Sequence, residues 1–220
     1  MSLTDFSFDL DSCVQELGEF DTFLKTHTDL KERADVLPFF KKHKHLSAYI
    51  STYNTGMEIF DKLDYEYGIY GKFSIDLMVG DSKNRKYTLI EFEDAKPTSI
   101  FQPNGNKKTL EWSHRFDHGF SQFVDWLWKF DDFKVTKDYQ TTFGKRDPKL
   151  FGILVIGRNK SLPSVEETER MEWRSRNVSI GKVDISCVTF DDLYSDLKER
   201  LTNGHKQFAS SKSFMEPTTH

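Results

Sequence analysis

Hydrophobic and polar positions follow two different periods along this chain. Two neighbouring stretches, 73–79 and 87–93, are mainly apolar, with polar residues spaced as on short strands. A period of two predicts β-strands, and the short polar turn at 80–85 predicts that the two strands form a hairpin. A continuously apolar run at 150–157 is typical of a strand buried on both faces, and the stretch 183–190 alternates.

The remaining apolar residues recur at helical spacing. The strongest pattern covers 114–130, where phenylalanines three and four residues apart form a stripe that should face the core. Pro38 should start or interrupt a second helical stretch, and Asn203-Gly204 should end the last helix. We therefore expect helices over 11–25, 30–53, 114–130, 162–177 and 191–201.

Strands and helices in this order predict an α/β fold with a central mixed sheet flanked by helices. A chain of 220 residues suits one such domain with extensions, and 20 Phe, 8 Tyr and 4 Trp supply ample material for its core. We expect an N-terminal helical extension over 1–53, the main domain over 54–204, and a polar, disordered tail over 205–220.

Charge and composition narrow the classes of function. A net charge of -4 argues against a uniformly basic nucleic-acid binder, although nine Lys and Arg against five Asp and Glu over 145–182 could supply a local positive surface. Cys13 and Cys187 are far apart and lack the spacing of a disulfide scaffold or a zinc module. With no signal peptide and no apolar run long enough to span a membrane, we expect a cytoplasmic protein.

Carboxylates on the predicted hairpin are the main candidates for chemistry. Glu91 and Glu93 lie two apart and so share one face of their strand, and the hairpin can fold Asp76 back beside them. Three such carboxylates repel one another unless a cation, usually a divalent one with oxygen ligands, neutralises them. The alternative is that they are solvated edge residues. Glu66 is either an ordinary surface acid or a fourth acidic group facing Asp76.

Two other segments could contribute to such a site. The stretch 98–113 has the composition of a loop and carries Lys107 and Lys108. On the predicted helix that follows, Gln122 is either a surface glutamine or a polar group held at the rim of the carboxylate cluster.

The order strand-Asp, turn, strand-Glu-x-Glu, helix and buried strand resembles the core of the PD-(D/E)XK nucleases. The resemblance implies that Asp76 and Glu91 bind Mg²⁺ or Mn²⁺. The third position of that motif is usually lysine, and here it is Glu93, as in some restriction endonucleases, where it could accept a proton from water or bind a second metal ion. Lys96 could replace the missing lysine only if the chain bends at Asp94-Ala95.

A series of motifs also resembles the Shedu family of bacterial antiphage defence proteins, which carry the DUF4263 domain. The resemblance covers roughly residues 50 to 202. It rests on the order of five segments: Glu66 with Asp76, Ile90-Glu-Phe-Glu93 with Ala95-Lys-Pro97, Ser121-Gln-Phe-Val-Asp-Trp126, Gly152-Ile-Leu-Val-Ile-Gly-Arg158, and Val188-Thr-Phe-Asp-Asp-Leu193.

The Shedu resemblance implies a metal-dependent DNA endonuclease with a restriction-endonuclease-like core. Its site would comprise Asp76, Glu91 and Glu93 as metal ligands or base, with Gln122 positioning, Glu66 as an auxiliary acid and Lys96 nearby. Nucleic-acid contacts are expected from Lys107, Lys108, Arg115 and Arg158, and family analogy suggests an oligomer. One alternative is a degenerate module on the same fold that binds nucleic acid or a partner protein without cutting. Another is a purely structural helper whose acids lie on the surface.

Overall fold

The computed structural model describes residues 3–213, and side chains from residue 3 to residue 203. A six-stranded sheet lies at its centre, and its strands run in the order β1-β2-β3-β6-β8-β7. The strands are β1 (Lys62–Ile69), β2 (Phe73–Asp81), β3 (Lys86–Phe92), β6 (Lys149–Val155), β8 (Val183–Val188) and β7 (Ser179–Ile180). β3, β6 and β8 are parallel, while β1, β2 and β7 pair antiparallel with their neighbours, so the sheet is mixed as predicted.

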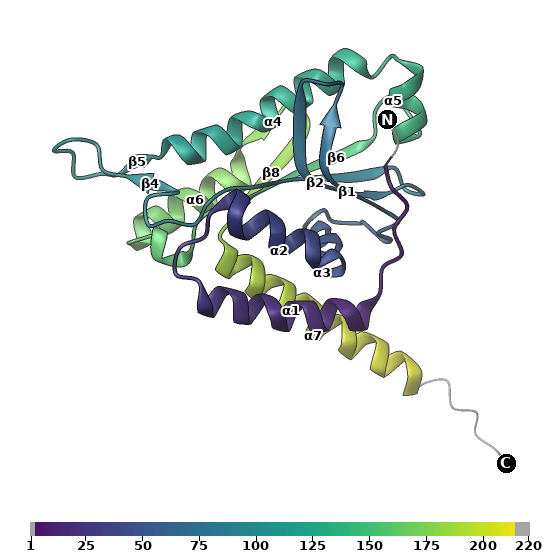
Figure 1. Ribbon diagram of the computed structural model, residues 1–220, viewed down its shortest axis with the longest axis horizontal. Helices are drawn as coiled ribbons and strands as arrows, with labels where there is room; N and C mark the ends of the chain where they lie inside the picture. The colour runs from purple at the N-terminus through teal and green to yellow at the C-terminus, as the bar shows by residue number, and fades with distance from the viewer. Residues whose placement is uncertain (1–2, 214–220) are drawn as a thin grey trace.

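Helices cover both faces of this sheet (Figure 1). One face packs against the N-terminal helices and the last helix: α1 (Leu10–Thr26), the π-helical turn η1 (Glu32–Val36), α2 (Leu37–Lys42), α3 (Lys44–Ile50) and α7 (Phe190–Ser213). The other face packs against α4 (His114–Phe133), α5 (Lys137–Phe143) and α6 (Val165–Asn177). Short 3-10 turns lie at Ser51–Tyr53 and Asn159–Ser161. Each face has its own buried apolar cluster, which confirms the predicted three-layer α/β architecture.

The local sequence explains the main elements. The phenylalanine stripe of α4 is buried against the sheet, and Ser113 caps the helix by accepting a hydrogen bond from the Phe116 backbone N–H. Pro38 lies in the first turn of α2, where its missing N–H costs nothing. A two-stranded ribbon, β4 (Phe101–Gln102) with β5 (Glu111–Trp112), projects from the body just before α4 (Figure 1).

Three details differ from the sequence expectations or lie beyond them. The polar stretch before β6 contains α5, whose Tyr139 and Phe143 are buried. α7 continues to Ser213, so Asn203-Gly204 does not end it, because a helix anchored by buried leucines tolerates the roughly 1 kcal/mol cost of an internal glycine. The disorder of 205–220 stays a prediction, and 214–220 lie outside the described residues. Within the described part of the chain, no helix is long and apolar enough to cross a membrane.

Candidate active site

The β2–β3 hairpin brings two of the predicted acids side by side. Leu77 pairs with Ile90, so Asp76 and Glu91 are the next residues opposite one another. The Phe92 backbone N–H donates a hydrogen bond of 3.0 Å to Asp76 Oδ2. The hairpin therefore places Asp76 where the sequence pattern predicted it.

Glu91 and Glu93 are not solvated edge residues. Glu91 is 2% exposed and Glu93 is fully buried, on the face of the sheet that α4 covers. A carboxylate buried this deeply needs a partner or a cation. The interpretation of these two acids as surface residues is therefore wrong.

Burial makes all three carboxylates harder to ionise. Desolvation raises the pKa of Asp76 to about 7, and the charges of nearby Glu32 and Glu93 add to this effect. Desolvation also raises the pKa of Glu91 well above its usual value, with Asp76 and Glu93 as the main charged contributors. The pKa of Glu93 is raised by burial as well, but His118 and Arg115 oppose the shift. Perturbed carboxylates gathered in this way are typical of functional sites.

Three polar side chains of α4 reach these carboxylates. Arg115, His118 and Gln122 are three and four residues apart, which places them on one face of the helix. Gln122 Nε2 donates a hydrogen bond to Glu91 Oε1. His118 Nδ1 lies 3.0 Å from Glu93 Oε1, and an Arg115 guanidinium nitrogen lies 3.1 Å from Glu93 Oε2. Gln122 is therefore held against the cluster, and the helical spacing is the signal that could have revealed His118.

Two oxygens of the cluster remain without a hydrogen-bond donor. Glu91 Oε2 and Glu93 Oε2 are buried and accept no hydrogen bond from any described residue, but Glu93 Oε2 forms the ion pair with Arg115. An unpartnered buried carboxylate oxygen such as Glu91 Oε2 fits a bound divalent cation. Within the described residues, no three His, Cys, Asp or Glu side chains come close enough to hold a metal ion by themselves. Mg²⁺ is commonly held by one or two carboxylates together with waters and phosphate oxygens, so a magnesium site at Asp76 and Glu91 stays a prediction.

A fourth acid reaches the cluster from the N-terminal extension. Glu32 begins η1, and its carboxylate lies 3.5 Å from the Arg115 guanidinium. Its charge raises the pKa of Asp76, Glu91 and Glu93. A β-bridge between Leu30 and Ala95 holds this segment beside the end of β3. No local motif marks Glu32, because only the fold brings it near the hairpin.

Glu66 lies opposite Asp76 in the register of β1 and β2, but its side chain bonds elsewhere. Its backbone has a φ of +49°, a left-handed conformation that is unusual for a non-glycine residue in a strand. Its carboxylate forms an ion pair of 2.5 Å with Lys41, and the hydrogen bond from Lys41 lowers the pKa of Glu66. Glu66 is therefore an exposed, paired acid at the rim of the site.

Lys96 lines a cleft that adjoins the carboxylates. β3 ends at Phe92, and Lys96 Nζ lies 2.8 Å from Asp94 Oδ2. The cleft has a volume of about 400 Å³ and is lined by Asp94, Lys96, Thr98, Ser99, Gln102, Ser113, His114, Arg115 and His118. Lys96 and two of the side chains that contact Glu93, Arg115 and His118, thus face one hollow.

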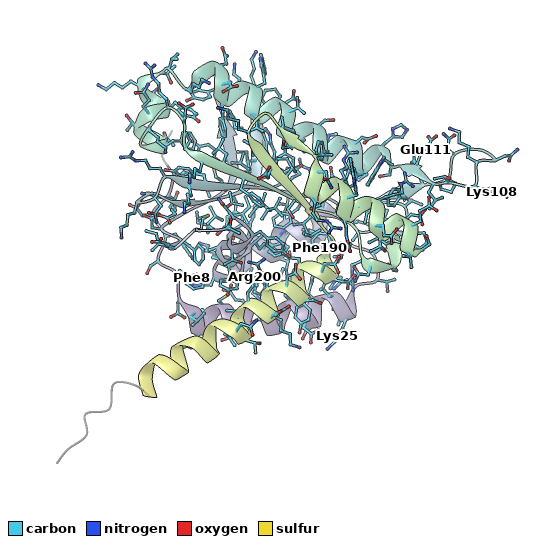
Figure 2. All side chains as sticks on the ribbon, turned by 180° about the vertical axis from the view of Figure 1, so that it is seen from behind. Phe8, Lys25, Lys108, Glu111, Phe190 and Arg200 are labelled. Carbon is cyan, nitrogen blue, oxygen red and sulfur yellow. The ribbon has the colours of Figure 1, made fainter. Side chains whose placement is uncertain are left out.

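The four basic residues predicted to contact nucleic acid fall into different surroundings. Arg115 lies in the site itself. Lys107 forms an ion pair of 2.5 Å with Glu111, and Lys108 lies at the projecting end of the β4–β5 ribbon (Figure 2).

Arg158 differs from the expectation. All three of its guanidinium nitrogens donate to protein acceptors: two to Asp191, at 2.7–3.0 Å, and one to the carbonyls of Leu24 and His27, both at 3.0 Å. These bonds join the segment after β6 to the C-terminal end of α1 and to the first turn of α7, and Arg158 does not line the cleft. The structure therefore gives Arg158 an architectural role within the chain, and its contact with nucleic acid stays a prediction.

Comparison with known proteins identifies the family. The family model described as Shedu protein SduA, C-terminal, matches residues 29–194, which is most of the chain. The chain belongs to the Shedu family. A comparison with curated proteins found no match. The matched range of this Shedu-type defence protein contains every residue of the carboxylate cluster and the cleft, whereas α1 and most of α7 lie outside it.

Proposed function

We propose that this Shedu protein is a metal-dependent DNA endonuclease that hydrolyses phosphodiester bonds in antiphage defence. The observation that carries the proposal is the pairing of half-buried Asp76 with buried Glu91. Both have a raised pKa, and Glu91 has an oxygen without a donor. Such a pair is costly to bury unless a cation neutralises it when the site is at work.

Asp76 and Glu91 would hold a Mg²⁺ or Mn²⁺ ion. When bound, a divalent cation polarises the scissile phosphate and lowers the pKa of a water molecule at the site. Gln122 orients Glu91 through its hydrogen bond to Oε1, which leaves Oε2 free as a ligand. No other polar side chain of α4 contacts Glu91 among the described residues, so we expect Gln122 to be a positioning residue.

Glu93 would accept a proton from the attacking water or bind a second cation. Burial raises its pKa, which favours the neutral acid, while Arg115 and His118 favour the ionised form. A raised pKa makes a carboxylate a stronger proton acceptor once it is ionised. Arg115 takes the place of the usual motif lysine as the nearest permanent positive charge, at 3.1 Å from Glu93.

The cleft beside Glu93 suits the DNA backbone. Lys96, His114, Arg115 and His118 line it, and it lies at the N-terminus of the 20-residue helix α4. Basic side chains and the positive end of a helix dipole both favour phosphate. We therefore expect backbone phosphates next to the scissile bond to occupy this cleft.

The first test is cleavage of supercoiled plasmid by the wild-type protein and by Asp76→Asn, with Mg²⁺, with Mn²⁺ and with EDTA. We expect metal-dependent cleavage by the wild type and a rate at least about a hundredfold lower for the variant, because it loses a metal ligand. Asp184→Asn is the matched control, since it removes the same charge from an exposed strand residue on β8. It should cleave like the wild type.

Two results would oppose the proposal in different ways. Retained cleavage by Asp76→Asn would exclude the assigned site. DNA binding that survives EDTA, with no cleavage by the wild type under any metal, would favour the non-cleaving module, whose structural basis would be Glu93 in place of the usual lysine.

A further inference from the structure

One arginine outside the candidate active site is packed on aromatic rings without a hydrogen-bond acceptor. The guanidinium carbon of Arg174, on α6, lies 4.3 Å from the ring centre of Phe120 and 4.9 Å from those of Phe116 and Trp112. Arg170, one helical turn earlier, covers the rings of Phe101 and Trp112 in the same way. We call these six residues the arginine platform.

The donors of Arg174 are unusual within this protein. Its Nε is buried without a hydrogen-bond partner, and within residues 3–203 no acceptor receives a bond from any of its nitrogens. The other partly buried arginines are paired: Arg158 with Asp191, Arg115 with Glu93, and Arg170 with the Leu110 carbonyl. A guanidinium has five N–H donors, and leaving them unmet near a protein interior is costly.

No internal anion balances this charge. Among the described side chains, no carboxylate lies within 4 Å of the Arg174 guanidinium, although its helix carries four glutamates. The nearby thiol of Cys187 is not an anion at neutral pH, because burial raises its pKa to about 12. The platform therefore presents a half-buried positive charge that no carboxylate of the described residues pairs with, and that an external anion can meet.

The arginine platform and the active-site cleft both include residues of the β4–β5 ribbon or next to it. Phe101 of β4 belongs to the platform, while its neighbour Gln102 lines the cleft. Trp112 of β5 likewise precedes Ser113, which lines the cleft and caps α4. The short β4–β5 ribbon thus contributes neighbouring residues to both surfaces, and its projecting end carries Lys108 (Figure 2).

We propose that the arginine platform binds a backbone phosphate of the DNA, next to the cleft but outside the catalytic cluster. The proposal rests on the proposed function, because it takes DNA as the ligand. When an arginine stacks on aromatic rings, the N–H groups at the edge of its guanidinium stay free to donate bidentate hydrogen bonds to phosphate oxygens. The aromatic rings fix the side chain in advance, which lowers the entropy lost on binding.

A phosphate is favoured over a carboxylate of a protein partner by its surroundings. The adjoining cleft carries Lys96, His114, Arg115 and His118, and the ribbon between them carries Lys107 and Lys108. A polyanion that follows this surface meets several basic side chains, some of them paired with acids of the chain, whereas a single carboxylate would use only one of them.

The test measures binding of a fluorescein-labelled 30-base-pair DNA duplex across a series of NaCl concentrations. Arg174→Met is compared with Arg176→Met, both in the Asp76→Asn protein so that the duplex is not cut. Arg176 lies on the same helix, is exposed and pairs with Glu172, so both variants lose one positive charge from α6. Methionine also keeps much of the apolar stem that packs on the rings.

We expect Arg174→Met to bind about tenfold more weakly than Arg176→Met at moderate salt. Its plot of log affinity against log salt should also be less steep by about 0.9, which is the effect of one lost phosphate contact. If Arg174→Met fails to fold, Arg174→Lys against Arg176→Lys replaces it. We then expect a severalfold loss of affinity with little change in the salt dependence. Lysine keeps the positive charge but lacks the planar guanidinium that stacks on the rings and donates bidentate hydrogen bonds.

The outcomes separate the platform from the proposed function. Equal affinity and equal slope for the Arg174 and Arg176 variants, with a lower melting temperature for the Arg174 variant alone, would make the platform a packing feature and overturn the proposal. If the parent protein binds no duplex at all, the proposed function fails and the platform with it. If the Asp76→Asn parent binds the duplex and the wild type cleaves DNA, while the two variants match, only the platform fails.

Discussion

At the scale of single residues, three neighbouring carboxylates form the candidate site. The fold brings Asp76, Glu91 and Glu93 together where burial raises their pKa values, so ionising them without a cation costs free energy. Because they interact, their protons leave as a coupled set. A bound divalent cation would stabilise the ionised carboxylates, and only the ionised form can bind it.

The raised pKa of Asp76 predicts an unusual dependence of stability on pH. The pKa of Asp76 in the folded protein, about 7, is above its ordinary value of 3.8. The folded state therefore holds this proton more tightly than the unfolded state, and stability falls as pH rises from about 4 to about 7. We expect the difference in free energy of unfolding between Asp76→Asn and the wild type to grow in favour of the variant by roughly 3 kcal/mol between pH 5 and pH 8.

Urea unfolding in EDTA at the two pH values measures this change, and Asp184→Asn is the control. The control should keep a constant difference from the wild type. Adding Mn²⁺ at pH 8 should restore wild-type stability but leave Asp76→Asn unchanged. If the difference in free energy of unfolding between Asp76→Asn and the wild type is the same at both pH values, the raised pKa of Asp76 is contradicted.

At the scale of elements, α4 positions the polar side chains that contact the carboxylates. Its helical repeat places Arg115, His118 and Gln122 against the carboxylates, and Gly119 lets the helix approach them closely. A Cβ atom at Gly119 would lie 2.9 Å from Glu93 Cγ and 2.8 Å from Leu154 Cδ1. Both distances are closer than side-chain atoms pack, so a larger residue must displace Glu93 or the helix.

Gly119→Ala should therefore reduce metal-dependent cleavage strongly while the protein stays folded. Overpacking costs about 1–3 kcal/mol, and the higher helix propensity of alanine returns about 1 kcal/mol. Gly18→Ala in α1 is the matched control, because a Cβ there meets nothing within 4 Å. We expect it to stabilise the fold by about 0.5–1 kcal/mol and to cleave normally. Plasmid cleavage and thermal unfolding measure both effects, and full activity of Gly119→Ala would contradict this role of α4.

Elements with a clear period could be predicted from the sequence, and contacts between distant elements could not. The hairpin of β2 and β3 and the phenylalanine stripe of α4 follow from local patterns, and so does the pairing of Asp76 with Glu91. α5 escaped prediction because its seven residues are mostly polar and only Tyr139 and Phe143 are buried. Element type follows local periodicity, while short polar helices depend on what they pack against.

At the scale of the whole molecule, the sheet gathers residues from most of the chain into one site. Glu32 comes from the N-terminal extension and Arg115 from α4, and the two meet beside Glu93 of the hairpin. No sequence pattern could have shown this meeting, since it depends on the Leu30–Ala95 bridge. Arg158 is the opposite case. Its sequence position after β6 suggested a contact with DNA, yet the fold surrounds its guanidinium with hydrogen-bond acceptors of the protein.

The most direct test of the central claim is calorimetric titration of Mn²⁺ and Mg²⁺ into the protein and into Glu91→Gln. It is carried out near pH 6.5 in two buffers of different ionisation enthalpy. The account predicts that the wild type binds the metal and releases protons, because carboxylates with raised pKa values must ionise to bind it. Both signals should disappear in Glu91→Gln. Equal binding by Glu91→Gln, or no binding by the wild type even with DNA present, would contradict the account.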